Sequence, residues 1–199
     1  MRRSALLGWI PPAIITVAIA VYAGGVMTGR WDPNPTRADA DVVPKVDSTD
    51  PEMRKSQELC PFVDRRELLD ILEPGAKVKG IGTTYDPGGD SHQCTVSLQY
   101  ASLRLNVAHD RLRVADYQGL FEQAQPRTVL GRPALWLLDP VPIVNIPLKS
   151  ASLLVAWDPT DPGGTASIAI IRESHDPGDE ARATQIAERI LPTLPGWPG

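Results

Sequence analysis

The sequence predicts a single α+β domain, with a mostly antiparallel β-sheet packed by helices, that follows an N-terminal transmembrane helix. Three observations support this prediction. Short segments with alternating apolar and polar residues follow one another in hairpin succession. Helical patterns stand apart from these strands rather than alternating with each of them, which favours α+β over a parallel α/β fold. The chain also begins with a long apolar run, so we divide it into residues 1–30, 31–58 and 59–199.

Residues 1–30 are predicted to be a membrane anchor. Arg2 and Arg3 precede an uncharged run, and residues 5–29 supply the ~20 apolar residues that cross ~30 Å of hydrocarbon. Positive charge at the start of a span keeps that end in the cytoplasm. We therefore expect a single-pass protein of the cell membrane that contacts the cytoplasmic membrane through residues 5–29. Its N-terminus would be cytoplasmic and its C-terminal domain extracytoplasmic.

A cleaved signal peptide is the alternative for the same segment. Residues 18–20, Ala-Ile-Ala, roughly fit a cleavage site. The apolar run is longer than a typical signal core, however, and Pro11 and Pro12 lie near its entry, so an anchor is favoured. Either interpretation places the body of the protein outside the cytoplasm.

Residues 31–58 are predicted to be an acidic, proline-rich tether. Four prolines alternate with acidic residues from residue 31 to about residue 54, without apolar periodicity. Such a composition cannot bury enough apolar surface to fold. We expect this segment to hold the domain away from the membrane.

The domain is predicted to open with a short helix. Asp64 would be its N-cap and Glu67 would complete a capping box. Val63 and Leu68 would form a hydrophobic staple, and Pro74-Gly75 would end the helix.

Cys60 and Cys94 are the only cysteines, and we expect them to form a disulfide in an oxidising compartment. This bond would join the first helix to a strand. Two buried free thiols, or a redox or metal pair, are the alternatives. A redox pair is normally Cys-x-x-Cys, and a zinc site needs three or four ligands.

Strands are predicted at residues 77–85 and 93–100. Cys94, Val96, Leu98 and Tyr100 would share one face of the second strand. The apolar alternation then moves from even to odd positions, and a side chain cannot change face along an uninterrupted strand. A turn or bulge near residues 101–102 is therefore expected.

The second half is predicted to contain a helix, four strands and a closing helix. Their ranges are 116–124 for the helix, 128–130, 134–138, 152–157 and 166–172 for the strands, and about 176–194 for the closing helix. Residues 158–164 would form a hairpin loop. Asp176 would cap the closing helix and Pro177 would take its first position. Its apolar stripe would contain Ala183, Ile186, Ala187, Ile190, Leu191 and Leu194.

The body resembles an actinobacterial family of exported, mostly lipid-anchored proteins of unknown function, of the LpqN type. The resemblance rests on Cys60, Pro61, Asp64 and Glu67, on Cys94 in a following strand, and on the Ala-rich closing helix. It implies an antiparallel α/β sandwich and an envelope-associated binding role, with no catalytic residues to carry over. The chain differs in lacking a lipid-attachment cysteine and in having Val96 where the family has an aromatic residue.

No pattern in the sequence indicates a catalytic, cofactor or metal site. His92, His109 and His175 are interpreted as exposed loop residues. Residues 174–176, Ser-His-Asp, are too close in sequence to converge as a triad. Residues 80–82 lack the context of a dinucleotide loop, and residues 158–161 lack EF-hand spacing. The mildly acidic composition argues against nucleic acid as a partner.

The function predicted from these observations is a noncatalytic, membrane-anchored binding or interaction module of the cell envelope. Its partner would be an envelope protein, a lipid or a cell-wall component. One alternative is an extracytoplasmic hydrolase, if loop carboxylates at Asp86, Asp90, Asp158 and Asp161 meet at one end of the sheet. The other is an accessory or sensor subunit of a membrane complex.

Overall fold

The computed structural model describes residues 50–86, 90–121, 123–138 and 148–198. The predicted anchor, residues 5–29, and most of the predicted tether lie outside these ranges. Within them, no helix has both the length and the apolar character needed to cross a membrane.

The predicted α+β architecture with an antiparallel sheet is confirmed. Every strand pair is antiparallel, and the sheet order is β1-β2-β3-β7-β6-β5-β4. The strands are β1 (Gly80–Tyr85), β2 (Ser91–Ser97), β3 (Ala101–Ala108), β4 (Gln125–Val129), β5 (Arg132–Leu138), β6 (Lys149–Ala156) and β7 (Thr165–Arg172). The helices are α2 (Pro51–Glu58), α3 (Cys60–Val63), α4 (Arg66–Leu72), α5 (Val114–Leu120), α6 (Asp179–Ile190) and the 3-10 turn η1 (Leu191–Thr193).

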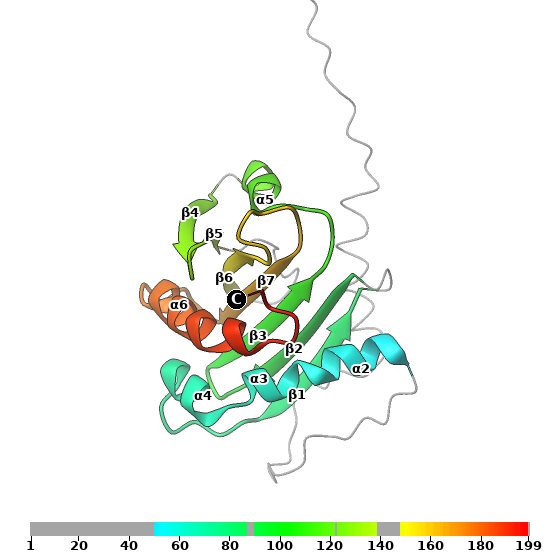
Figure 1. The fold of residues 1–199 in the computed structure, drawn as a ribbon. Helices are drawn as coiled ribbons and strands as arrows, with labels where there is room; N and C mark the ends of the chain where they lie inside the picture. Colours follow the sequence, from blue (N-terminus) through cyan, green and yellow to red (C-terminus); the bar gives the residue numbers. More distant parts are fainter. Residues whose placement is uncertain (1–49, 87–89, 122, 139–147, 199) are drawn as a thin grey trace, which may run out of the picture. The chain divides into compact units, whose positions relative to one another are not determined.

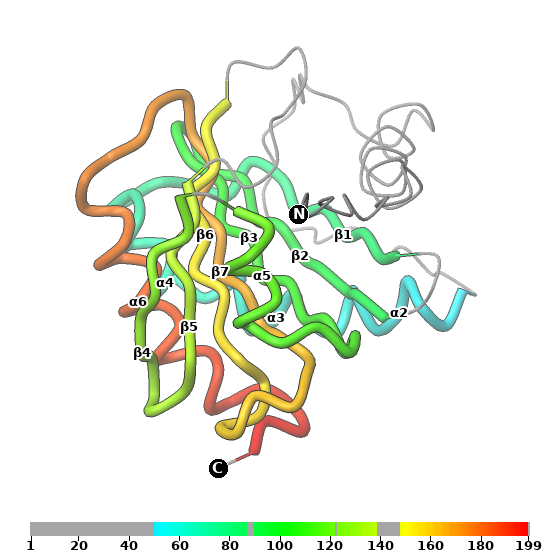
Figure 2. The backbone as a smooth tube through the Cα atoms, turned by 90° about the horizontal axis from the view of Figure 1, so that it is seen from above, coloured from blue at the N-terminus to red at the C-terminus, as the bar shows by residue number. Residues whose placement is uncertain are grey.

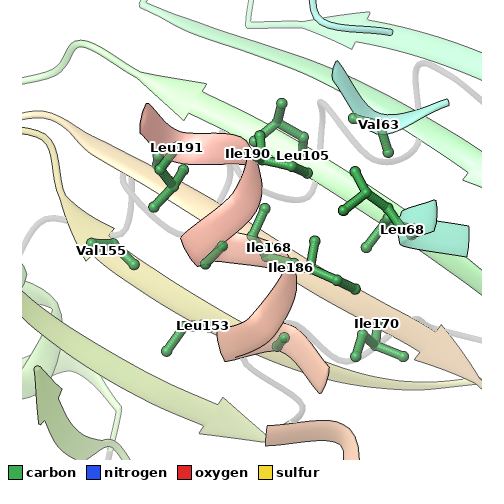
Figure 3. Close-up of a cluster of buried hydrophobic side chains, with 14 of the residues drawn as sticks. Val63, Leu68, Leu105, Leu153, Val155, Ile168, Ile170, Ile186, Ile190 and Leu191 are labelled. Carbon is green, nitrogen blue, oxygen red and sulfur yellow. The ribbon is translucent and has the colours of Figure 1, made fainter. Parts of the chain in front are cut away.

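The two faces of the sheet are covered differently. Helices α2, α3, α4 and α6 gather on one side, which we call the core face (Figure 1). Their apolar side chains pack against alternate residues of the strands, as Figure 3 shows for Ile168 and Ile170 of β7. On the opposite face α5 covers a smaller cluster over β5 and β6. Figure 2 shows the path of the same strands as a tube, seen from above.

Helix α6 matches the prediction along its apolar stripe and differs at its start. Each predicted stripe residue is buried, and Ile186 and Ile190 are completely inaccessible. The helix begins at Asp179, after Gly178, rather than at Pro177. The Asp176 carboxylate instead accepts a hydrogen bond of 2.7 Å from the Gly178 N–H, so it closes a turn before the helix.

The predicted Cys60–Cys94 disulfide is present. Cys60 lies at the start of α3 and Cys94 lies in β2, and both are buried in the main core. The bond therefore joins the first part of the domain to the interior of the sheet.

The predicted first helix is wrong in its cap and its start. The Asp64 N–H donates to the Cys60 carbonyl at 2.8 Å, so Asp64 ends α3 instead of opening a helix. Arg65 is extended and precedes α4. Two short helices replace the predicted one because Pro61, near the α3 N-terminus, suits the first helical turn and starts helix formation earlier.

The predicted tether boundary at residue 58 is also wrong. Residues 51–58 form α2, which lies over β1 and β2, so this part of the predicted tether belongs to the fold. Asp50 caps this helix by accepting from the Glu52 N–H, and Pro51 takes its first turn. Helix α2 has no apolar periodicity that could predict it from the sequence, because its buried side chain is the polar Ser56.

Other predictions in this region hold with local corrections. The expected turn between β2 and β3 exists, with the Leu98 N–H donating to the Ala101 carbonyl. Tyr100 lies in this turn and is 73% exposed, so it does not share the buried face of β2. The predicted helix 116–124 is α5, which starts two residues earlier and leaves Leu120 exposed at 67%.

We predict that Ile186→Ala lowers the free energy of unfolding by roughly 2–5 kcal/mol, because it removes a buried side chain and leaves a cavity. Leu120→Ala, in the exposed part of α5, is the control and should change it by less than about 0.5 kcal/mol. Urea unfolding monitored by circular dichroism measures both changes. Equal effects would contradict the assignment of the core.

We predict that the double variant Cys60→Ser/Cys94→Ser loses roughly 3 to 4 kcal/mol, because the disulfide closes a loop of 34 residues in the unfolded chain. Unfolding the unmodified protein with a reductant should give a similar loss. A difference below about 1 kcal/mol between variant and parent would mean that the bond does not stabilise this fold.

Candidate binding face

The hairpin loops that contain the four candidate carboxylates lie at the same end of the sheet. The pairs Tyr85–His92, Ser91–Ala108 and Ala156–Thr165 place the β1–β2 and β6–β7 connections on that end. The His109 N–H donates to the Asp90 carbonyl at 2.7 Å, which connects the β1–β2 loop to the segment that follows β3.

Two of the carboxylates serve the loop backbone. Asp158 accepts hydrogen bonds from the Thr160 N–H at 2.7 Å and from its hydroxyl at 2.6 Å, and these bonds lower the pKa of Asp158. Asp161 accepts from the Val114 N–H at 3.0 Å, at the first turn of α5. These contacts are those of turn and helix-terminus aspartates.

An aromatic cluster covers the same end of the sheet. The Trp157 ring makes edge-to-face contacts with His109, at 4.9 Å between centroids, and with Trp197, at 5.1 Å. Arg132 lies over the Trp197 ring and donates to the carbonyls of Trp157 and Pro198. His109 keeps an exposed surface, but its ring is partly desolvated against Trp157, and this lowers the pKa of His109, with a smaller contribution from His92 and Lys55. The cluster fixes the C-terminal residues to the β6–β7 loop.

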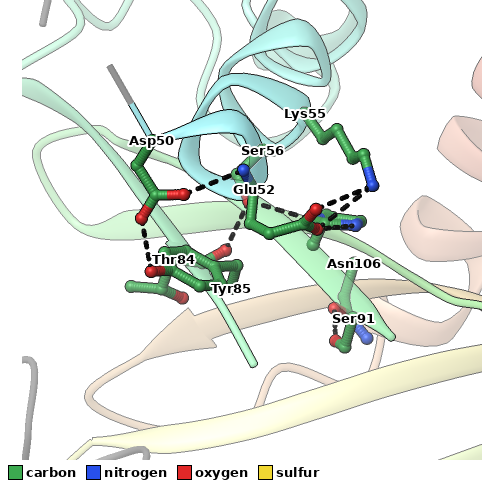
Figure 4. A network of polar contacts seen from close by, with 9 residues as sticks. Asp50, Glu52, Lys55, Ser56, Thr84, Tyr85, Ser91 and Asn106 are labelled. Carbon is green, nitrogen blue, oxygen red and sulfur yellow. Dashed lines mark hydrogen bonds and ion pairs between the residues drawn. The ribbon is translucent and has the colours of Figure 1, made fainter. Parts of the chain in front are cut away.

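The structure brings together a serine, a histidine and a glutamate that the sequence analysis did not connect. Ser56 Oγ lies 3.4 Å from His92 Nδ1, and His92 Nε2 lies 3.4 Å from Glu52 Oε2. Glu52 also pairs with Lys55 at 2.9 Å. Figure 4 shows Glu52, Lys55 and Ser56 projecting from α2 toward β1 and β2.

This trio lacks the accessibility that a nucleophile needs. Ser56 is completely buried, and its hydroxyl donates to the Thr84 carbonyl at 2.9 Å. A hydroxyl has a single hydrogen, so the Ser56 proton is directed toward a backbone carbonyl and not toward the imidazole. The arrangement therefore fastens α2 to the β1–β2 hairpin.

His92 is buried, contrary to the interpretation as an exposed loop residue, whereas His109 and His175 are exposed. The sequence pattern could have predicted that His92 is buried, because His92 lies on the same face of β2 as the buried Cys94 and Val96. No local pattern could have predicted the burial of Ser56, because its hydrogen-bond partners lie 28 and 36 residues away along the chain.

A second polar contact joins the start of α2 to β1. The Tyr85 hydroxyl donates a 2.5 Å hydrogen bond to Asp50, as drawn in Figure 4. This bond, together with the Glu52 N–H, lowers the pKa of Asp50, and the carboxylate raises the pKa of the Tyr85 hydroxyl. The contact stabilises the ionised form of Asp50.

A buried ion pair lies at the opposite end of the sheet. Asp179, 1% exposed, has Arg172 Nη2 at 2.9 Å and Arg182 Nη1 at 3.1 Å. Arg182 also pairs with Asp176 at 2.9 Å. The Gly178 N–H, and after it Arg182, lower the pKa of Asp176. The charges compensate one another and fasten the N-terminus of α6 to β7.

The surface with the most regular arrangement of polar groups is the side of β1, β2 and β3 opposite the core. We call it the hydroxyl face. Its side chains are Thr84, Ser91, Gln93, Thr95, Ser97, Ser102, Arg104 and Asn106. All of them are partly exposed, and α2 and α3, which pack on these strands, lie on the core side.

Cross-strand hydrogen bonds order the hydroxyl face. Ser91 donates to Asn106 at 2.7 Å, Arg104 donates to Thr95 at 3.1 Å, and Ser102 donates to Ser97 at 3.2 Å. Gln93 donates to Thr84. Polar pairs of this kind hold neighbouring side chains in fixed directions. Arg104 is the only ionisable side chain of the set, so the face offers mainly neutral donors and acceptors.

The remaining surface within the described ranges offers no comparable site. No group of three or more His, Cys, Asp or Glu side chains there is arranged to hold a metal ion. A shallow depression of about 460 Å³ on α6 is lined by Pro177 and by residues of that helix, including Thr184 and Glu188. Comparison of the chain with protein-family models, with curated proteins and with solved structures finds no match.

We predict that Tyr85→Phe raises the pKa of Asp50 toward its ordinary value of 3.8, because the main stabilising hydrogen bond is lost. In the parent, a lowered pKa gives a contribution to stability that is complete above about pH 3.8 and is lost as the pH falls through the folded-state value. The variant should lack this part of the acid dependence. Carbon-detected NMR titration of the Asp50 carboxyl measures the shift.

Tyr100→Phe is the matched control, because Tyr100 is 73% exposed and its hydroxyl accepts a hydrogen bond from the neighbouring Gln99, far from Asp50 in the sequence. It should leave the Asp50 titration unchanged. An unchanged Asp50 pKa in Tyr85→Phe would show that the hydrogen bond does not control this carboxyl.

We also predict that Ser56→Ala destabilises the fold by roughly 1–3 kcal/mol, because it removes a completely buried hydroxyl and leaves its partners without that contact. Ser174→Ala, at an exposed position, should have almost no effect. Thermal and urea unfolding of both variants test this. Equal stability of the two variants would contradict a structural role for Ser56.

Proposed function

We propose that this protein is a noncatalytic, membrane-anchored extracytoplasmic module that binds a component of the cell envelope through its hydroxyl face. Residues 5–29 would hold it in the cytoplasmic membrane. The domain that contains residues 50–198 would lie outside, and the predicted tether would separate it from the membrane. This role agrees with the one implied by the resemblance to the LpqN-type family.

The disulfide supports the proposed location. Bonds such as Cys60–Cys94 persist in oxidising compartments and are rare in the cytosol. The pair is buried and joins α3 to β2, which is the arrangement of a stabilising bond rather than of an exchanging one.

The hydroxyl face carries the binding role. Its neutral donors and acceptors follow three adjacent strands on a rigid scaffold, so their directions are fixed before a partner arrives. Preorganised groups lose little conformational entropy on binding. A surface without large apolar side chains favours a polar partner, such as a protein or cell-wall component, over lipid acyl chains.

The hydrolase alternative has one favourable observation, because the loops that carry the four aspartates lie at the same end of the sheet. Asp158 and Asp161 nevertheless bond to their own loop and to α5, and Ser56 is buried. Catalysis by the loop aspartates or by Ser56 would require their present hydrogen bonds to be replaced. The binding role requires no such change.

Photo-crosslinking in intact cells tests the proposal. A benzoylphenylalanine residue is introduced at Thr95, in the middle of the hydroxyl face, or at Glu188, on the exposed side of α6, as the control. We expect a reproducible crosslinked envelope component from position 95 and none from position 188. Identical products from both positions would refute binding at this face.

A second measurement addresses the enzyme alternative. The purified full chain in detergent is incubated with envelope glycans and peptides. Turnover that Asp158→Asn or Asp161→Asn abolishes would overturn the noncatalytic role. No turnover, together with the position-specific crosslink, is the expected result.

A further inference from the structure

The two edges of the sheet are protected to different degrees. Edge strand β4 contains Pro126, which has no N–H, and Arg127, which pairs with Glu180 of α6. Both are devices that hinder pairing with another strand. Edge strand β1, with the sequence Gly-Ile-Gly-Thr-Thr-Tyr, contains no proline and no charged residue. It has the composition of a strand that can accept a neighbour.

The outward-facing groups of β1 can be assigned from the ladder. The Asp86 N–H donates to the Ser91 carbonyl, and these two residues continue the β1–β2 register. Hydrogen-bonded and non-hydrogen-bonded pairs alternate along an antiparallel ladder. The backbone groups of Thr84 and Gly82 therefore point to β2, and those of Ile81, Thr83 and Tyr85 point to the outer edge.

Helix α2 lies over the face of β1 and not along its outer edge. Thr83 Oγ1 donates to the Met53 sulfur at 3.3 Å, and Ser56 reaches the Thr84 carbonyl from the same helix. His92, which Ser56 also contacts, belongs to β2, on the inner side of β1. These contacts place α2 above the hairpin.

Charge is distributed unevenly along the edge. Lys77 and Lys79 precede β1, whereas Asp86 and Asp90 follow it. An antiparallel neighbour with the same sequence brings the basic end of one strand next to the acidic end of the other. A parallel neighbour would bring like charges together. The edge is therefore electrostatically complementary to a second copy of itself in antiparallel orientation.

We propose that β1 pairs in antiparallel orientation with β1 of a second copy of this chain, forming a two-fold symmetric dimer with one continuous sheet. If the two-fold axis passes between the two Thr83 residues, Ile81 of each copy pairs with Tyr85 of the other. The outward-facing backbone N–H and C=O groups of both strands then form the hydrogen bonds between the copies. In a continuous antiparallel sheet this axis is perpendicular to the sheet. Both hydroxyl faces then point to the same side and form a double-width surface.

A six-residue strand pair buries little area, so the interface belongs to the small, weak class. Two copies held in one membrane, as the proposed function has it, would meet at a raised effective concentration. The pairing itself does not depend on what the hydroxyl face binds.

Proline substitution at matched edge positions tests the dimer. Thr83→Pro removes an outward N–H from β1. Thr128→Pro does the same on β4, where the two-residue Leu130-Gly131 turn makes Val129 and Arg132 a hydrogen-bonded pair, so that the Thr128 N–H faces outward. The mass of the full chain in detergent is measured by size exclusion with light scattering over a range of concentrations.

We expect the parent and Thr128→Pro to form dimers and Thr83→Pro to remain monomeric up to at least a tenfold higher concentration. A monomeric parent overturns the proposal. Dimers of all three proteins also overturn it, because contact through residues 5–29 or another surface would then account for association.

Charge reversal covers the case in which Thr83→Pro does not fold. Lys79→Glu should weaken the dimer several-fold, because it places negative charge next to the acidic end of the partner strand. Arg111→Glu, an exposed reversal away from β1, should not. The dimer of the parent should also weaken with increasing salt. Equal behaviour of the two variants would refute the antiparallel arrangement.

Discussion

The packing of α6 against the core face of β6 and β7 is the contact on which the rest of the structure depends. Ile186 and Ile190 project into the centre of the sheet, where they meet side chains of β3, β6 and β7. The sheet order places β7 between β3 and β6, so the last strand of the chain joins the first half to the second. Helix α6 covers the junction of β3, β7 and β6. The folding of both halves of the sheet therefore depends on residues near the C-terminus.

Around this apolar centre, polar side chains hold the periphery in place. Asp50 and Ser56 fasten α2 to β1, and Asp179 fastens α6 to β7. These residue types are also those used in catalysis, but here they are bonded to backbone groups or to compensating charges. The hydroxyl face differs because its side chains bond to one another across strands and remain partly exposed to solvent.

Features set by local periodicity were predictable from the sequence. The α6 stripe, the change of face between β2 and β3, and the disulfide all follow from patterns of a few residues or from a lone pair of cysteines. Helix α2 and the Ser56–His92 contact were not predictable, because a polar helix fastened by long-range hydrogen bonds leaves no apolar period. The N-cap at Asp64 was mistaken because Pro61 started a helix earlier. The edge difference between β1 and β4 needed the strand order, which local sequence does not contain.

The position of Cys60 has a mechanical consequence. A force that pulls on the chain ahead of Asp50 reaches α2 first, and α2 is fastened mainly by hydrogen bonds that can be broken one after another. Two residues after α2 the chain meets Cys60, which is covalently bound to the interior strand β2. Tension then passes through the disulfide into the sheet and bypasses α4 and β1. The bond therefore limits how far the folded region can be extended from its N-terminal side.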